Sequence, residues 1–108
     1  MLAGGFGPDV GFIDRVLGQT FDRLNVDAGR LAITGFSAGA SYALSLGLTN
    51  GDLFTHAIAC SPGFAAPADR RGNPPVFVSH AKRDRVLSIE RCSRRIVPQL
   101  EREGDEVT

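Results

Sequence analysis

The sequence predicts an α/β protein in which helices flank a parallel sheet. Three short apolar segments of strand length, at 31–34, 56–61 and 75–80, are spread among longer segments with helical periodicity. The apolar segments do not alternate with polar residues, which is typical of parallel strands buried on both faces. The first of them turns abruptly into a helical segment, as in α/β folds. A chain of 108 residues forms one small domain at most.

The first half of the chain predicts a helix, a strand and a second helix. Apolar residues recur at three- and four-residue steps over 10–24, and Asp9 stands where it can cap that helix. A polar turn over 25–30 leads into a buried strand at 31–34. The segment 38–48 is rich in small residues and predicts a helix that ends at 50–52, where Asn, Gly and Asp follow one another.

The second half predicts two strands and one further helix. Strands at 56–61 and 75–80 are joined by a loop over 62–74, which holds two Gly and three Pro and lacks helical periodicity. Ser88 can cap a last helix, and Pro98 predicts a kink or break in it near Ile96 or Val97. Gly104 ends this helix. Residues 106–108 resemble the start of another strand.

Composition and charge exclude several classes of function. Twelve basic residues balance twelve acidic ones, so neither nucleic acid nor an anionic membrane is an expected partner. The sequence has no apolar run that could span a bilayer. Its first residues lack the basic start and apolar core of a signal peptide, so a soluble chain in the cytoplasm is the default expectation.

The two cysteines do not predict a metal site. Cys60 lies in a predicted strand and Cys92 in a predicted helix, without a C-x-x-C pair or a His at ligand spacing. We expect no metal and two buried free thiols, with a disulfide as the alternative.

The most informative segment is 35–39, with the sequence GFSAG. A G-x-S-x-G string between a strand and a helix is typical of a nucleophile elbow, in which the Ser is strained and the glycines avoid collisions with strand and helix. The string alone should arise roughly once in ten shuffled chains. The alternative is that Ser37 merely caps the helix. The strand before it and the helix after it favour the elbow.

Two segments resemble the α/β-hydrolase superfamily. The first is DVGFIDRVLGQTFDRLNVDAGRLAITGFSAGASYAL, which resembles the helix, strand and elbow of the polyhydroxyalkanoate-depolymerase and feruloyl-esterase-like branch. The second is PVFVSHAKRDRVLSIERC, which is similar to that branch's H-G-x-x-D-x-V-x-P segment. The matches cover most of residues 9–95. The resemblance implies that 1–108 form a single partial α/β-hydrolase domain, from the elbow to the start of the last strand.

The resemblance implies a serine esterase without a cofactor. Ser37 would attack a small-molecule ester to form an acyl-enzyme, the N–H of Ala38 would donate to the oxyanion, and Asp84 would orient a His. The alternative for Asp84 is a surface acid in the basic run 82–85. That basic run could favour an acidic acyl group, or it could be a solvated rim.

The sequence departs from the family pattern at the catalytic base. The family's His follows the last strand, and this sequence does not contain it; the first strands and the second oxyanion donor are also missing. His80 is a candidate substitute base or pocket residue, although the matching His in the family is usually structural. His56 begins a strand at the opposite end of the sheet.

Two rival functions follow from these departures. The first is a non-catalytic, truncated or degenerate hydrolase that acts through self-association or a partner. In the fold that this chain resembles, segments missing here cover one face of the sheet and pair with its edge. The resemblance therefore implies an uncovered apolar face and an unpaired edge, which predict a homo-oligomer or a complementing chain. The second rival is nucleic-acid binding through the arginines of 88–103. It needs a one-sided basic face, and Glu90, Glu101 and Glu103 argue against it.

Overall fold

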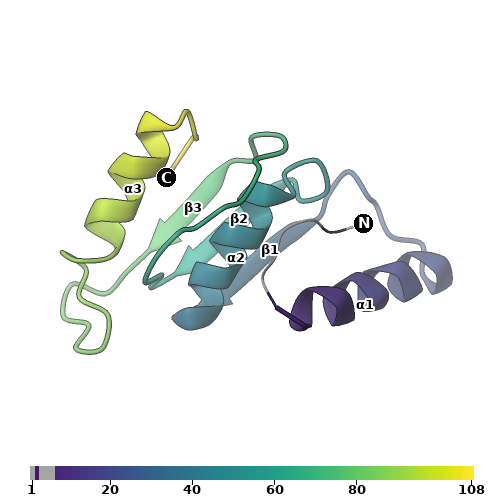
Figure 1. Cartoon of the computed structure of the whole chain (residues 1–108), viewed down its shortest axis with the longest axis horizontal. Helices are drawn as coiled ribbons and strands as arrows, with labels where there is room; N and C mark the ends of the chain where they lie inside the picture. The colour runs from purple at the N-terminus through teal and green to yellow at the C-terminus, as the bar shows by residue number, and fades with distance from the viewer. Residues whose placement is uncertain (1, 3–6) are drawn as a thin grey trace.

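The computed structural model describes residues 2 and 7–108. It contains three helices and three strands in these residues (Figure 1). In chain order they are α1 (Asp9–Arg23), β1 (Ala32–Phe36), α2 (Ala38–Thr49), β2 (His56–Cys60), β3 (Val76–Ser79) and α3 (Ser93–Arg102). The loop between β2 and β3 holds no helix, as expected. The α/β fold class predicted from the sequence is confirmed.

The three strands form one parallel sheet in the order β1-β2-β3. Thr34 of β1 pairs with Ile58 of β2, which pairs in turn with Phe77 of β3. The free edge of β3 begins to pair with the end of the chain, where Val76 and Val107 form a parallel bridge. The expected start of a further strand at 106–108 is therefore confirmed.

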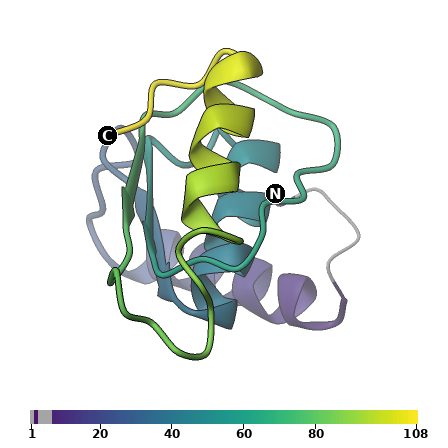
Figure 2. The ribbon, with the colours of Figure 1, turned by 90° about the vertical axis from the view of Figure 1, so that its left-hand side faces the viewer.

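The core lies between one face of the sheet and the helices α2 and α3 (Figure 2). Leu44 and Leu48 of α2 and Leu100 of α3 are almost completely buried. The sheet contributes the small residues Ala57 and Ala59 of β2 to this cluster, so the helices approach its backbone closely. The buried members of this cluster are Ala40, Leu44, Leu48, Ala57, Ala59, Val76, Cys92, Ile96 and Leu100.

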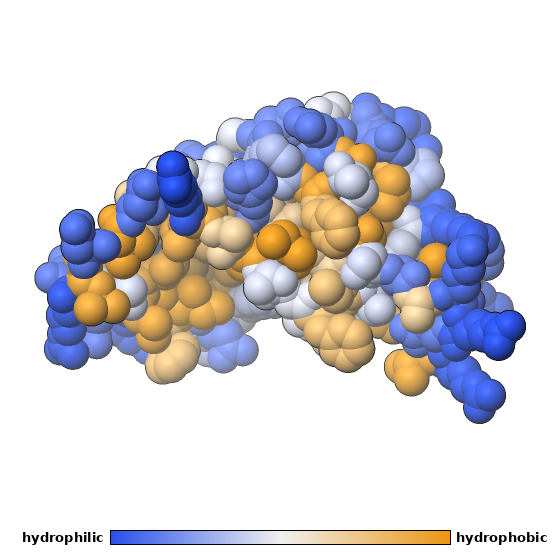
Figure 3. Space-filling model, turned by 180° about the vertical axis from the view of Figure 1, so that it is seen from behind, coloured by the Kyte–Doolittle hydropathy of each residue, from blue (hydrophilic) through white to orange (hydrophobic). Residues whose placement is uncertain are grey.

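The opposite face of the sheet is largely uncovered. Phe36 is 71% exposed and Phe77 is 47% exposed, and both project from this face. Figure 3, which views the molecule from behind, shows apolar residues across the middle of this face. The expectation of one uncovered apolar face is therefore confirmed for the described residues, because α2 and α3 cover the other face only. The burial on both faces that apolar strands suggest is not found in these residues.

The two thiols have different surroundings. Cys92 is buried in the core, but Cys60 is only half-buried. Cys60 pairs with Phe36 in the sheet, so the two side chains lie on the same, uncovered face. Both cysteines are free. The expectation of burial is thus correct for Cys92 and wrong for Cys60.

Helix α1 lies beside β1, at the end of the molecule away from α3 (Figure 1). Its buried residue Val10 belongs to a second apolar cluster with Leu46 of α2 and Phe54 of the loop after it. Asp9 is the first residue of the helix, and Pro8 occupies the cap position. Asp9 is therefore not the cap that had been predicted. Its carboxylate lies in the first turn, where its negative charge interacts favourably with the positive end of the helix dipole.

Helix α3 starts later than the sequence predicts. Residues 89–92 form turns, in which the carbonyl of Ser88 accepts the N–H groups of Arg91 and Cys92, and the helix begins at Ser93. Pro98 lies inside the helix without breaking it. Residues on both sides of it, Ile96 and Leu100, are buried in the core and hold the helix in place. Gly104 follows the helix with a φ of 95°, so the predicted stop is confirmed.

Leu44→Ala should destabilise the chain far more than Phe77→Ala. Leu44 is fully buried, so its truncation leaves a cavity and should cost about 2–5 kcal/mol of unfolding free energy. Phe77 loses much less burial, because half of its side chain is already exposed. Urea denaturation of both variants measures the difference. Equal losses would contradict the assignment of the core to the helix-covered face.

Candidate active site

The turn between β1 and α2 holds Ser37 in an uncommon backbone conformation. Its φ is 58° and its ψ is −121°. Such a conformation costs a non-glycine residue on the order of 1–3 kcal/mol and persists only where the surroundings fix it. The N–H of Ser37 donates to the carbonyl of Cys60 at 2.9 Å, and its own carbonyl accepts the N–H groups of Ala40 and Ser41. Hydrogen bonds from strand and helix thus fix the turn on both sides.

Gly35 is required at this turn because the backbone of α2 passes directly over it. A Cβ at Gly35 would lie 2.2 Å from the carbonyl oxygen of Gly39 and 2.8 Å from the nitrogen of Ala40. Such contacts with backbone atoms cannot be relieved by a side-chain rotation. A Cβ at Gly39 meets nothing within 4 Å. The predicted collision is therefore found at Gly35 and not at Gly39 in the part of the chain that the structure describes.

The side chain of Ser37 does not cap α2. It makes no capping hydrogen bond, although Ser37 occupies the cap position. The alternative that Ser37 is only a helix cap is therefore wrong. Ala38 is the first residue of α2, so its N–H has no acceptor within the helix. The hydroxyl of Ser37 and this N–H lie together at the positive end of the helix dipole.

Asp84 lies in a tight turn after β3. Its Oδ1 accepts the N–H groups of Val86 and Leu87, both at 2.9 Å. These bonds, from Leu87 first and then Val86, hold the pKa of Asp84 below its ordinary value, and His80 lowers it further. Its Oδ2 lies 3.5 Å from Nε2 of His80. The turn therefore keeps the carboxylate ionised and leaves one oxygen uncommitted to the backbone.

His80 is buried and engaged on both sides of its ring. Its side chain is 1% exposed. Nε2 lies 2.6 Å from the carbonyl oxygen of Leu87, and Nδ1 lies 2.6 Å from Oγ of Ser93. Because a carbonyl only accepts, Nε2 carries the proton, and Nδ1 faces the Ser93 hydroxyl. This arrangement favours the structural role for His80 over the role of a substitute base.

The parallel sheet places the elbow and the Asp84 turn at one edge. Ser37 follows β1 and the turn follows β3, so both lie at the carboxyl edge of the sheet (Figure 1). Ligand sites of open α/β sheets form at this edge. His56 begins β2, at the opposite end of the sheet, and its Nδ1 lies 3.1 Å from the hydroxyl of Thr55. Of the two histidines, only His80 is at the candidate site.

Three hydroxyl groups of α2 form a feature that the sequence analysis missed. Ser41, Ser45 and Thr49 stand four residues apart, and their oxygens accept backbone N–H groups from the loop that follows β2. The donors in that loop are Gly63, Phe64, Ala66 and Ala68. The four-residue spacing on an apolar helix was the available signal. These hydroxyls fasten the loop along α2.

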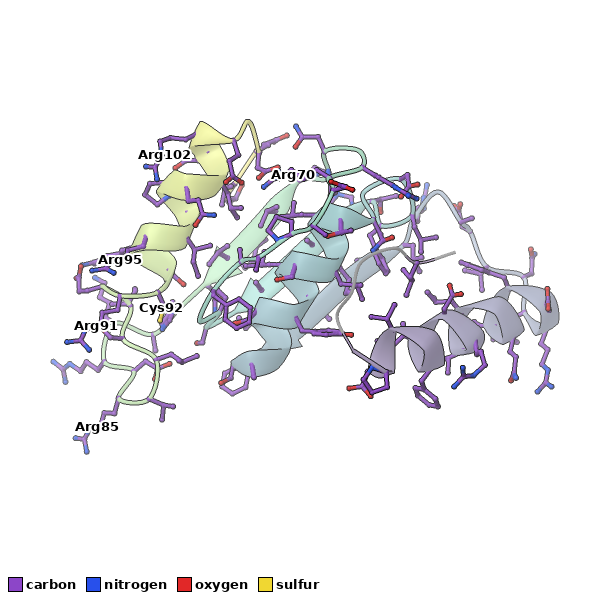
Figure 4. All side chains as sticks on the ribbon, viewed as in Figure 1. Arg70, Arg85, Arg91, Cys92, Arg95 and Arg102 are labelled. Carbon is purple, nitrogen blue, oxygen red and sulfur yellow. The ribbon has the colours of Figure 1, made fainter. Side chains whose placement is uncertain are left out.

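Basic side chains surround the Asp84 turn and follow the outer side of α3. Figure 4 shows Arg85, Arg91, Arg95 and Arg102 along the turn and the helix. Glu90 is paired with Arg94, and Arg70 binds both Glu103 and Asp105. Two of the acids expected to interrupt a basic face are thus paired with other residues.

No cluster of His, Cys, Asp and Glu side chains that could hold a metal ion occurs in residues 2 and 7–108.

The fold and the turn together define the class of the protein. A parallel sheet, a strained Ser between strand and helix, and an Asp after the third strand of that sheet are typical of α/β hydrolases. Residues 13–95 match the family described as "Putative esterase", and the chain belongs to this esterase family. None of the helices in the described residues is both long and apolar enough to cross a membrane.

Two solved structures are similar to the chain. One is described as the crystal structure of a thermostable esterase, with 26% identity and a TM-score of 0.73 over 92% of this chain. The other is the crystal structure of esterase PE8, with 26% identity and a TM-score of 0.77 over 91% of this chain. This chain spans 26% and 47% of those two chains. No match was found among curated proteins.

Gly35→Ala should destabilise the fold strongly, whereas Gly39→Ala should be tolerated. The new methyl group at Gly35 would overlap the backbone of α2, and separating strand from helix would cost several kcal/mol. At Gly39 the same methyl has free space and raises helix propensity by up to about 1 kcal/mol. Thermal unfolding of the two variants tests this. A Gly35→Ala chain as stable as the wild type would refute the close approach.

Proposed function

We propose that this chain carries the nucleophile of a carboxyl-ester hydrolase, and that Ser37 forms an acyl-enzyme. The observation that supports this most is the conformation of Ser37, which is strained, uncapped and placed at the start of α2. Strain of this kind gathers at active sites because it presents a reactive group. Membership of the esterase family supports the same reaction class.

The proposed reaction assigns a role to each group at the carboxyl edge of the sheet. Oγ of Ser37 attacks the acyl carbon and passes its proton to a base, and the leaving alcohol takes a proton from that base. The N–H of Ala38 donates to the oxyanion. Asp84 orients the base through Oδ2, the oxygen that accepts no N–H from its own turn. Neither His80 nor His56 is placed to act as the base, so the proposal requires a His from outside these 108 residues.

The substrate is proposed to be a small-molecule ester. The resemblance to the polyhydroxyalkanoate-depolymerase and feruloyl-esterase-like branch favours hydroxyalkanoate, aryl or short acyl esters. The arginines near Asp84 would favour an ester with an acidic group (Figure 4). The proposed chemistry uses no cofactor, because a serine, a base and an oxyanion donor suffice for acyl transfer.

Ser37 should be the hydroxyl that reacts with a fluorophosphonate probe. The wild-type chain should gain the mass of one phosphonyl group, because the elbow presents Ser37 beside an N–H donor. Intact-mass analysis measures the labelling. Ser37→Ala should remain unlabelled, and Ser61→Ala, which changes the other serine with a positive φ, should label like the wild type.

Ester turnover by the chain alone should be very low. Loss of the base in a comparable hydrolase lowers kcat on the order of 10⁶-fold, and loss of one oxyanion donor lowers it about 10²–10³-fold.

Two outcomes would contradict these assignments. Labelling that persists in Ser37→Ala would refute the assignment of the nucleophile. Robust turnover that His80→Ala abolishes would show instead that His80 is the base.

A second candidate function is non-catalytic association. The uncovered sheet face, with Phe36 and Phe77 exposed, favours it, since exposed apolar patches on a parallel sheet are normally covered. The edge of β1 away from β2 is a further site for pairing. In this reading the elbow persists as structure, and the chain acts as a homo-oligomer or beside a complementing chain.

Sedimentation velocity at low micromolar concentration should show a dimer or a larger assembly. Phe36→Ser combined with Phe77→Ser should shift the chain toward monomer, because both side chains lie on the uncovered face. Phe12→Ser, on an exposed position of α1, is the matched control and should not change the assembly. A wild-type chain that sediments as a compact, cooperatively melting monomer would contradict association through this face.

A further inference from the structure

We infer that Ser41 is a positioning residue that fixes the Ser37 elbow relative to the Asp84 turn, acting through the loop at 63–64. This inference rests on the proposed function, because it assigns Ser41 to the same site. The contacts form a continuous path from the elbow through α2 and the loop to the acid. The steps in the path are hydrogen bonds, except for the one from Gly63 to Leu87, whose side chain lies beside the glycine.

The path begins at the elbow. The N–H of Ser41 donates to the carbonyl of Ser37 at 3.1 Å, which closes the first turn of α2. Ser41 itself is 1% exposed. Its hydroxyl oxygen accepts the N–H of Gly63 at 2.8 Å and the N–H of Phe64 at 3.1 Å. One buried hydroxyl therefore satisfies two backbone donors of the loop, and no water is needed to pair them.

The path continues from the loop to the acid turn. A methyl group built at Gly63 would lie 3.4 Å from Cδ2 of Leu87 and 3.4 Å from Oγ of Ser41, so these two side chains border the small space beside Gly63. The N–H of Leu87 donates to Oδ1 of Asp84 at 2.9 Å. The carbonyl of Leu87 accepts Nε2–H of His80 at 2.6 Å. Leu87 thus transmits the position of the loop to the carboxylate.

The two other hydroxyls of α2 provide an internal comparison. Ser45 accepts the N–H of Ala66 at 2.9 Å, and Thr49 accepts the N–H of Ala68 at 3.0 Å. They make the same kind of bond to the same loop, but their partners Ala66 and Ala68 lie beyond Gly63, the loop residue beside which the Leu87 side chain lies. Loss of Ser45 or Thr49 leaves one backbone donor unpaired and loss of Ser41 leaves two, at a cost of about 1–3 kcal/mol for each donor. Only loss of Ser41 should also move the acid turn.

The test compares Ser41→Ala with Ser45→Ala and follows Asp84 by NMR. The pKa of Asp84, read from its carboxyl carbon, should rise toward its ordinary value in Ser41→Ala, because the bonds from Val86 and Leu87 that lower it loosen. It should stay unchanged in Ser45→Ala. The charged neighbours His80, Lys82, Arg83 and Arg85 are the same in both variants, so a difference reports the geometry of the turn.

A second variant keeps the test decisive if Ser41→Ala does not fold. Leu87→Ala removes the side chain that packs on Gly63 and should raise the pKa of Asp84 in the same direction. Equal pKa values of Asp84 in the wild type and Leu87→Ala, or equal shifts in Ser41→Ala and Ser45→Ala, would overturn the positioning role.

Labelling of Ser37 separates this inference from the proposed function. If both hold, a fluorophosphonate should label Ser41→Ala several-fold more slowly than Ser45→Ala at matched stability, with Ser41→Thr restoring the rate. An unlabelled wild type with the Asp84 shift intact would refute the esterase function and keep the positioning role. A labelled wild type with equal rates in the two alanine variants would refute the positioning role and keep the function.

Discussion

The close approach of β1 and α2 is the constraint on which the site depends. The carbonyl of Gly39 occupies the space that a side chain at position 35 would need. This contact brings the start of α2 over the end of the strand, and Ser37 connects the two with a positive φ of 58°. The strain at Ser37 is thus the consequence of a packing contact. In this conformation the hydroxyl of Ser37 makes no capping bond to α2.

Small residues make the approach compatible with a packed core. Ala40 of α2 and Ala57 and Ala59 of β2 are fully buried, and Gly47 of α2 lies against Ile33. Larger side chains at these positions would lift the helix from the sheet and relax the turn at Ser37. Leu44 and Leu48 then fill the space toward α3. The apolar core and the strained serine are therefore parts of one arrangement.

Polar contacts fix the loops at the carboxyl edge of the sheet. The hydroxyls of α2 bind the loop after β2, and His80 and Asp84 bind the turn after β3. The salt bridge between Arg70 and Asp105 joins the first of these loops to the end of the chain. A loop of this length would otherwise expose unpaired backbone groups. The acid side of the site is thus shaped by hydrogen bonds, whereas the serine side is shaped by steric contact.

Features set by local sterics could be predicted from the sequence. Gly35 and Ser37 identify the elbow because the close approach involves residues only four positions apart. The strands were predicted from their short apolar runs, which are also a local feature of the sequence. The structure extends the first strand to Phe36. The end of α3 at Gly104 was predicted because a positive φ, which glycine adopts easily, is a local property of the residue that follows a helix.

Features set by distant contacts could not be predicted. Ser88 resembled a helix cap, yet capping depends on how the chain enters the helix, and α3 starts at Ser93. Pro98 was expected to kink or break the helix, and the helix runs through it unbroken. The role of Ser41 was missed because its partner, Gly63, is 22 residues away. Apolar strands alone indicate burial on both faces, but burial depends on which elements cover them; the uncovered face was expected only from the family resemblance.

The conformation of Ser37 is the central claim, and scalar and residual dipolar couplings measure it directly. In the uniformly labelled chain, the couplings of residues 36–38 should define a positive φ for Ser37, near the 58° of the structure. The Ser37 hydroxyl should then accept no hydrogen bond from the first turn of α2. A negative φ, with the hydroxyl accepting the N–H of Ala40, would make Ser37 an ordinary helix cap and contradict this account.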